Sequence, residues 1–162
     1  MSDQKHVLFV CTGNTCRSPM AEGLFRKAVS DRSDFQVSSA GVAASKGTPC
    51  SSETRTLLNS RGISSSDFRS RPVTDAILAA ATHVFAMTRS HLHTLESRFP
   101  EHSDKFYLAC EFTQFASSGH SIDVPDPIGM GRSAYAEVAN TLDAAIPSII
   151  AYIDQTSPKK TA

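Results

Sequence analysis

The amino-acid sequence predicts a single α/β domain, with a parallel β-sheet and helices on both of its faces. Short apolar runs alternate along the chain with longer segments of helical periodicity, a pattern typical of strand–helix–strand units. The length of 162 residues suits one domain, and 40% hydrophobic against 20% charged residues is an ordinary globular balance. Right-handed crossovers between parallel strands leave few topologies. We expect residues 1–156 to form the domain and the tail 157–162 to be disordered.

The first strand and the first helix are predicted on either side of a turn that contains Gly and Asn. Residues 7–10 form a short apolar run, as in a buried strand, and the strand is expected to end at Cys11. Ser18 and Pro19 give a helix-start signal, because a hydroxyl can cap free amides and Pro fits the first helical position. The helix is therefore predicted from Pro19 to about Val29.

The remainder of the chain repeats this alternation. Gly62 and Pro100 mark the ends of two helices, and a long loop is expected over 117–131. The last helix carries apolar residues at helical spacing, and Pro147 is expected to kink it. The predicted strands cover residues 35–37, 83–87 and 105–108, and the predicted helices cover residues 51–61, 74–81, 89–99 and 133–154.

The charge balance and the lack of long apolar segments exclude several classes of protein. Sixteen Lys and Arg residues against sixteen Asp and Glu residues give a formal net charge of zero, so we expect no nucleic-acid partner. No segment has the composition of a signal peptide or the length of a membrane span, so we expect no membrane partner and a cytoplasmic location. In that reducing compartment the four cysteines would remain thiols.

The segment from Cys11 to Ser18, with the sequence CTGNTCRS, is the strongest candidate for a functional site. Ligands of parallel α/β sheets bind at the carboxyl ends of the strands, where this turn and the segment after Met87 are both expected to lie. If the turn curls, its amides and the positive end of the following helix converge on one point and can hold a tetrahedral dianion. The residues expected to bind phosphate or another oxyanion are Thr12, Gly13, Asn14, Thr15, Cys16 and Arg17.

Three residue types in this turn suit phosphate chemistry. Arg17 can grip two phosphate oxygens with a charge that is not titrated at ordinary pH. Gly13 and Asn14 tolerate the left-handed backbone that such a loop is expected to need. The positive field is expected to lower the pKa of Cys11 and to give a thiolate nucleophile, to which Ser18 could donate a hydrogen bond. A protective disulfide between Cys11 and Cys16 stays open.

Phosphoryl transfer also needs a proton for the leaving atom and a base for water. Asp126, followed by Pro127 in the long loop, is the best candidate for both tasks, because a carboxylate over a phosphate site would have a raised pKa. An Asp-Pro pair is also a common turn signal, and a turn is therefore the alternative.

Several other polar residues are expected to have no special function. We expect no metal or other cofactor, because His91 and His93 lie two residues apart on a helix and point to different faces, and no zinc-like spacing with Cys occurs. The histidines are therefore predicted to lie on the surface. Buried, inert thiols are predicted for Cys50 and Cys110. Solvated charges are predicted for Glu22 and Asp123.

Four motifs give the chain a resemblance to the low-molecular-weight protein-tyrosine-phosphatase family over nearly its whole length. They are VLFVCTGNTCRSPMAE near the start, SSAG at 38–41, VFAMT at 84–88 and VPDPIGMG at 124–131. The resemblance implies a four-stranded parallel sheet flanked by helices, a cysteinyl-phosphate intermediate and no metal.

Carried over residue by residue, the resemblance makes Cys11 the nucleophile, Arg17 the phosphate-binding arginine and Asp126 the general acid. Ser18 matches the hydroxyl that assists the nucleophile. Asn14 and Ser39 match a polar network that holds the shape of the loop in the family. Phe68 stands where the family often has a His.

The substrate is predicted to be a phosphorylated protein, with phosphoarginine ahead of phosphotyrosine. Tyrosine-specific members resemble one another in their aromatic walls, whereas this chain has Ile128 and Gly129 after the Asp-Pro pair and no aromatic residue at 42–49. The loop CTGNTCRS resembles that of bacterial protein-arginine phosphatases, in which the threonine, here Thr15, acts as a selectivity filter; simple packing of Thr15 against the helix is the alternative.

Two less favoured functions share this loop. An arsenate reductase of the same family would need further cysteines near the end of the third strand, and residues 82–89 contain none. A catalytically silent phosphate-binding module is expected to lack the nucleophile or the acid, and both residues are present.

Overall fold

The computed structural model describes residues 4–114 and 122–156, and the predicted tail 157–162 and part of the predicted loop 117–131 lie outside these ranges. Its centre is a four-stranded parallel sheet in the order β2-β1-β3-β4. Val7 pairs with Val37 on one side of β1, and Val10 pairs with Ala86 on the other. The predicted parallel α/β fold is therefore confirmed. The strands are β1 (Lys5–Cys11), β2 (Phe35–Gly41), β3 (His83–Ala86) and β4 (Phe106–Leu108).

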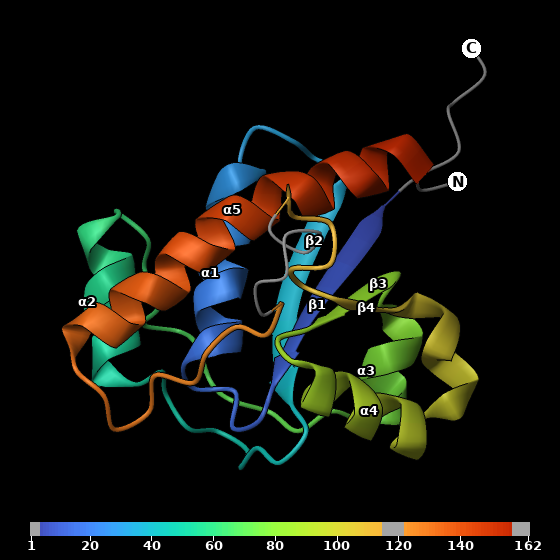
Figure 1. The fold of residues 1–162 in the computed structure, drawn as a ribbon, viewed down its shortest axis with the longest axis horizontal. Helices are drawn as coiled ribbons and strands as arrows, with labels where there is room; N and C mark the ends of the chain where they lie inside the picture. The colour runs from blue at the N-terminus through green and yellow to red at the C-terminus, as the bar shows by residue number, and fades with distance from the viewer. Residues whose placement is uncertain (1–3, 115–121, 157–162) are drawn as a thin grey trace.

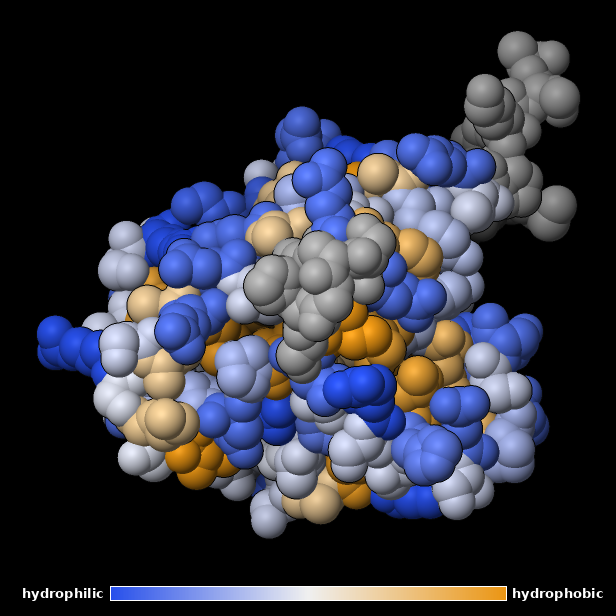
Figure 2. All heavy atoms as spheres, viewed as in Figure 1, coloured by the Kyte–Doolittle hydropathy of each residue, from blue (hydrophilic) through white to orange (hydrophobic). Residues whose placement is uncertain are grey.

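Helices cover both faces of the sheet, as predicted (Figure 1). Helices α1 and α5 lie on one face, and α2 packs beside them. Helices α3 and α4 lie on the opposite face. On the face that Figure 2 shows, hydrophobic side chains are visible only in small areas between hydrophilic ones. The helices are α1 (Arg17–Ala28), α2 (Ser52–Ser60), α3 (Asp75–Ala80), α4 (Arg89–Arg98) and α5 (Arg132–Thr156).

The central strand β1 divides the apolar core in two. Side chains of a strand alternate between its faces, so Val7 and Phe9 join the cluster under α1 and α5, while Leu8 and Val10 join the cluster under α3 and α4. All four side chains are fully buried. This double burial explains why the strand is a continuous apolar run rather than an alternating one.

The helix ends differ from the prediction where side chains act as caps. Ser51 and Thr74 were predicted as first helical residues, but each lies one position before its helix and accepts a hydrogen bond from an amide of the first turn. Ser18 was predicted as a cap, and this is wrong: α1 begins at Arg17, and the Ser18 hydroxyl bonds the Cys11 thiol and the Asn14 amide instead.

One proline lies away from its predicted position, and another lies inside the helix for which it was predicted. Pro19 is the third residue of α1, not the first, and fits there because the amides of a first helical turn have no intrahelical partner. Pro147 lies inside α5, which continues through it to Thr156. A 3₁₀ helix, η1 (Pro100–Lys105), was not predicted; it begins at the proline that ends the preceding helical pattern.

The strand order places three loops at one edge of the sheet. Because β1 lies between β2 and β3, the chain leaves β1 toward one side and returns on the other, and a ligand site is expected at this switch point. The amide of Met87 donates to the Val10 carbonyl, and the amide of Val124 donates to the Met87 carbonyl, each at 2.9 Å. The loop that carries Asp126 is thereby fixed beside the end of β1. No helix within the described ranges has the length and apolarity that crossing a bilayer requires.

Candidate active site

Asn14 shapes the loop between β1 and α1. Its backbone is left-handed, with φ at 58°, and its side chain is fully buried. Its amide nitrogen donates to the hydroxyls of Ser18 at 2.8 Å and Ser39 at 2.9 Å, and its oxygen accepts from the Arg71 amide at 3.0 Å. The structure thus brings Asn14 and Ser39 together. Of the two residues expected to tolerate a left-handed backbone, Asn14 adopts it and Gly13 does not.

Gly41 at the end of β2 allows the loop to approach the sheet. A Cβ atom at this position would overlap the Thr12 carbonyl oxygen and would lie 2.8 Å from the Ala44 Cβ and 3.0 Å from the Asn14 amide. Such distances are too short for any side chain. The glycine in the SSAG motif is therefore required by close contact with the loop.

Neighbouring segments pair with carbonyls of the loop, whereas the loop amides stay free. Among the described residues, the amides of 12–17 donate to no protein group. Unpaired amides beside the N-terminus of α1 suit an anion. The carbonyls of Cys11, Thr12 and Thr15 accept hydrogen bonds from the amides of Val42, Ala43 and Ser51, each at 2.9 Å.

Cys11 lies at the base of this loop, with 2% of its surface exposed. Its Sγ is 2.8 Å from the Ser18 Oγ, so the hydroxyl can donate to a thiolate. The thiol of Cys16 has other neighbours, since it lies 3.4 Å from the Tyr135 hydroxyl and 3.8 Å from the Thr15 hydroxyl. All four cysteines are free in the structure.

Arg17 and Asp126 meet at the mouth of the loop. Arg17 is buried, and its Nη1 donates to the Val124 carbonyl at 3.0 Å. Its Nη2 lies 3.8 Å from the Asp126 Oδ2. The Asp126 side chain is half exposed, and its Oδ1 accepts from the Ile128 amide at 3.1 Å. The carboxylate therefore forms an Asp-Pro turn and is also held near the loop.

His91 belongs to this site, although the histidines were predicted to lie on the surface. Its Nε2 lies 2.7 Å from the Thr12 Oγ1, and only 5% of the residue is exposed. Burial, followed by the charge of Arg17, lowers the pKa of His91 to about 4. The prediction failed because helical spacing does not show which residue faces a distant loop. A usable signal was present, since the segment after Met87 was expected at this edge of the sheet.

Glu22 and Asp123 were predicted as solvated charges, and this is wrong for Glu22, whose side chain is 15% exposed, whereas the Asp123 side chain is 32% exposed. Glu22 accepts from the Ser39 hydroxyl at 2.7 Å and pairs with Arg26 at 2.8 Å, so it extends the network around Asn14. Asp123 accepts from the Arg89 amide at 2.8 Å, at the start of α4. Both carboxylates therefore hold elements that surround the site.

The other predicted features lie at some distance from the loop. Cys50 and Cys110 are buried, and burial raises the pKa of each thiol to about 11, in keeping with inert thiols. Phe68 is partly buried and lines a cavity of about 310 Å³ together with Glu22 and Cys50. The network behind the loop thus reaches Glu22 rather than a histidine at position 68.

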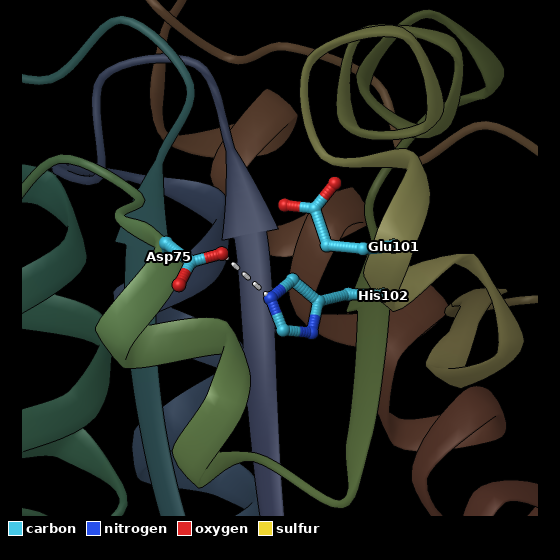
Figure 3. A group of neighbouring side chains, drawn as sticks. All are labelled: Asp75, Glu101 and His102. Atoms are coloured by element: carbon cyan, nitrogen blue, oxygen red, sulfur yellow. Dashed lines mark hydrogen bonds and ion pairs between the residues drawn. The ribbon is translucent and has the colours of Figure 1, made fainter.

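A group of metal-ligand types lies away from the loop, between α3 and η1. The candidate ligand atoms of Asp75, Glu101 and His102 lie within 4.8 Å of one another (Figure 3). The His102 Nε2 is 2.9 Å from the Asp75 Oδ1, and both acidic residues are exposed. The hydrogen bond between His102 and Asp75 joins the two elements at this grouping.

Comparison with known proteins identifies the family. Residues 6–159 match the family "Low molecular weight phosphotyrosine protein phosphatase". The chain belongs to this family. It is therefore a protein phosphatase by family, and the resemblance drawn from the four sequence motifs is confirmed.

Relatives within the low-molecular-weight phosphatase family carry two kinds of name. A protein-arginine-phosphatase of Geobacillus stearothermophilus is 37% identical over 140 residues, which cover 86% of this chain and 90% of the relative. A solved low molecular weight protein tyrosine phosphatase of T. tengcongensis is 41% identical, with a TM-score of 0.83 and coverage of 92% and 99%. A solved mutant of YwlE arginine phosphatase, with a phosphorylated active site serine in place of cysteine, is 30% identical, with a TM-score of 0.84 and coverage of 93% and 97%.

Proposed function

We propose that this protein is a cysteine-dependent hydrolase that removes the phosphoryl group from phosphoarginine in proteins. The observation that carries the substrate choice is Thr15, together with the lack of aromatic residues at positions 42–49 and 127–131. Ile128 is 60% exposed, and the backbone of Gly129 has φ at 76°, so an aryl ring would have little to stack on after Asp126. The name of the Geobacillus relative supports the same choice.

In the first step of the proposed reaction, the phosphoryl oxygens lie against the free amides of the loop and the Arg17 guanidinium. The Cys11 thiolate attacks phosphorus in line, and an S–P bond forms while the P–N bond of phosphoarginine breaks. Asp126 gives its proton to the departing guanidine nitrogen. The products are a cysteinyl phosphate on Cys11 and an unmodified arginine side chain.

In the second step, Asp126 takes a proton from water as the water oxygen attacks phosphorus. The S–P bond breaks, and inorganic phosphate leaves. The Ser18 hydroxyl, 2.8 Å from Cys11, donates to the departing thiolate and stabilises it. The phosphorylated active site serine in the YwlE mutant supports a phosphoryl-enzyme intermediate of this kind.

Thr15 is proposed to select the leaving group. The Thr15 Oγ1 lies 3.8 Å from the Cys16 Sγ. A Cβ atom added at Gly13 would also lie 3.8 Å from this oxygen, so the Thr15 side chain sits at the loop itself. A hydroxyl occupies less apolar volume there than the aliphatic side chain of tyrosine-specific relatives. Once Asp126 has given up its proton, its carboxylate, which lies between the Ile128 amide and Arg17, can pair with the cationic guanidinium leaving group.

Phosphotyrosine is the second candidate substrate, because the 41% identical solved relative is named a tyrosine phosphatase. The discriminating experiment compares kcat/KM on a phosphoarginine protein and on a phosphotyrosine peptide, for wild type and Thr15→Ile. The variant Cys11→Ser serves as the blank. We expect wild type to prefer phosphoarginine and Thr15→Ile to reverse the preference. A preference for phosphotyrosine with Thr15 intact would contradict the proposal.

The proposed partners are phosphorylated proteins, with inorganic phosphate and other oxyanions as small ligands of the loop. Free thiols at all four cysteines suit the reducing cytoplasm, which we propose as the location. Incubating the purified protein with vanadate, an oxyanion of similar shape, should inhibit turnover competitively. Uncompetitive inhibition would place the oxyanion site elsewhere.

A further inference from the structure

The contact between His91 and Thr12 connects helix α4 to the residue that follows Cys11. His91 is the third residue of α4, and its amide is capped by the Thr88 hydroxyl at 3.1 Å. Its Nε2 lies 2.7 Å from the Thr12 Oγ1, the shorter end of the range for hydrogen bonds. Thr12 itself is exposed at the surface of the loop, whereas His91 is buried beneath it.

The second ring nitrogen of His91 decides which atom donates in this contact. Nδ1 is buried and has no hydrogen-bond partner among the described residues. A neutral imidazole carries one N–H donor and one lone-pair acceptor, so the proton lies on either Nδ1 or Nε2. A proton on Nδ1 would leave a buried N–H donor unpaired, which is rare in folded proteins. The favoured tautomer therefore has its proton on Nε2 and donates to the Thr12 Oγ1.

This direction of donation leaves the Thr12 hydroxyl proton available. The oxygen of Thr12 accepts from His91, and among the described residues its hydroxyl has no other partner. Thr12 directly follows Cys11, so its hydroxyl belongs to the loop that is proposed to hold the phosphoryl group.

We propose that His91 is a positioning residue, which donates from Nε2 to Thr12 and thereby directs the Thr12 hydroxyl proton toward the group undergoing transfer. The inference rests on the proposed phosphatase function. It assigns His91 a role beyond that of a purely structural link between α4 and the loop, because such a link does not require the Thr12 hydroxyl proton to reach the group undergoing transfer.

The tautomer can be measured without any substrate. Two-bond ¹H–¹⁵N correlation spectra of the full chain distinguish a histidine protonated on Nε2 from one protonated on Nδ1, and the variant His91→Gln assigns the signals. We expect the Nε2–H tautomer at neutral pH, both free and with inorganic phosphate. An Nδ1–H tautomer would overturn the proposal, whatever the outcome of the substrate experiments.

Kinetics on the generic substrate para-nitrophenyl phosphate test the role itself. The variants His91→Leu and Thr12→Val should each lower kcat by about tenfold with KM little changed, as expected for one hydrogen bond made mainly in the transition state. Because the two residues act in series, the double variant should lose no more than either single variant. The conservative variants His91→Gln and Thr12→Ser, which keep a donor and a hydroxyl, should restore most of the activity.

The matched control is His93→Leu, which removes a histidine from the exposed face of the same helix. It should leave kcat within about twofold of wild type. Losses from His91→Leu and Thr12→Val that add in the double variant, or that appear in KM with a fall in Tm, would reduce the contact to a structural link. Because para-nitrophenyl phosphate serves any phosphatase of this family, failure of the phosphoarginine preference would leave this test intact.

Discussion

The burial of His91 predicts that the protein loses stability as the pH falls below the ordinary range of histidine. The pKa of His91 in the folded protein is lowered to about 4, from 6.5 for an exposed imidazole. The unfolded chain therefore binds a proton near pH 6.5, whereas the folded chain binds it only near pH 4. Between these values the unfolded state holds more protons, so stability is present above pH 6.5 and is lost as the pH falls toward 4.

The magnitude follows from the difference between the two pKa values. It is 6.5 minus 4, or about 2.5 units. At about 1.4 kcal/mol per unit, this one residue makes the free energy of unfolding about 3 kcal/mol smaller at pH 4 than at pH 7. That loss is a large part of the roughly 5–15 kcal/mol that is typical of a folded domain.

The assay is urea unfolding between pH 7 and pH 4, followed by circular dichroism, for wild type and for His91→Gln. The pKa values of His6 and His83 are also lowered, mainly by burial, and carboxylates titrate near pH 4, but these groups are common to both proteins. The difference between the two curves therefore isolates His91. We expect the variant to lose about 3 kcal/mol less than wild type over this range.

Parallel curves for wild type and His91→Gln would refute the reasoning, because they would mean that His91 has the same pKa in both states. The variant His93→Gln provides the control, since His93 is exposed on the same helix. Its curve should run parallel to that of wild type.

Three further predictions concern the loop and the surface. Asn14→Ala should lower the free energy of unfolding by about 2–4 kcal/mol in urea titrations, because it removes two buried hydrogen bonds and one partly buried one; no measurable loss would contradict the network. Gly41→Ala should lower kcat/KM by about a hundredfold by displacing the loop, whereas Gly131→Ala, with nothing near its Cβ position, should change it little. Arg32→Ala breaks ion pairs to Asp34 and Asp154, and should lower Tm slightly at low salt but not at 1 M salt, with a cost of at most about 1 kcal/mol.

Most of the fold could be predicted because local pattern determined it. Each element leaves a pattern of apolar residues that reflects the faces it buries. Examples are the apolar run before Cys11 and the helical periodicity of the last helix, which can both be read from the sequence. The ends of helices were harder to predict where a polar side chain can either cap the helix or bond another part of the structure. Ser18 has the chemistry of a helix cap, but its hydroxyl bonds Cys11 and Asn14, and only the folded loop offers those partners.

The sequence by itself determined the parallel α/β class and the candidate loop, because strand, turn and helix follow one another within a few residues. The tertiary structure alone decided which distant groups complete the site. The parallel pairing of β1 with β3 brings α4 beside the loop, so His91 meets Thr12 across 79 positions of the chain. The same crossover geometry carries Asp126 to Arg17. Contacts of this kind depend on strand order and burial, which no local spacing encodes.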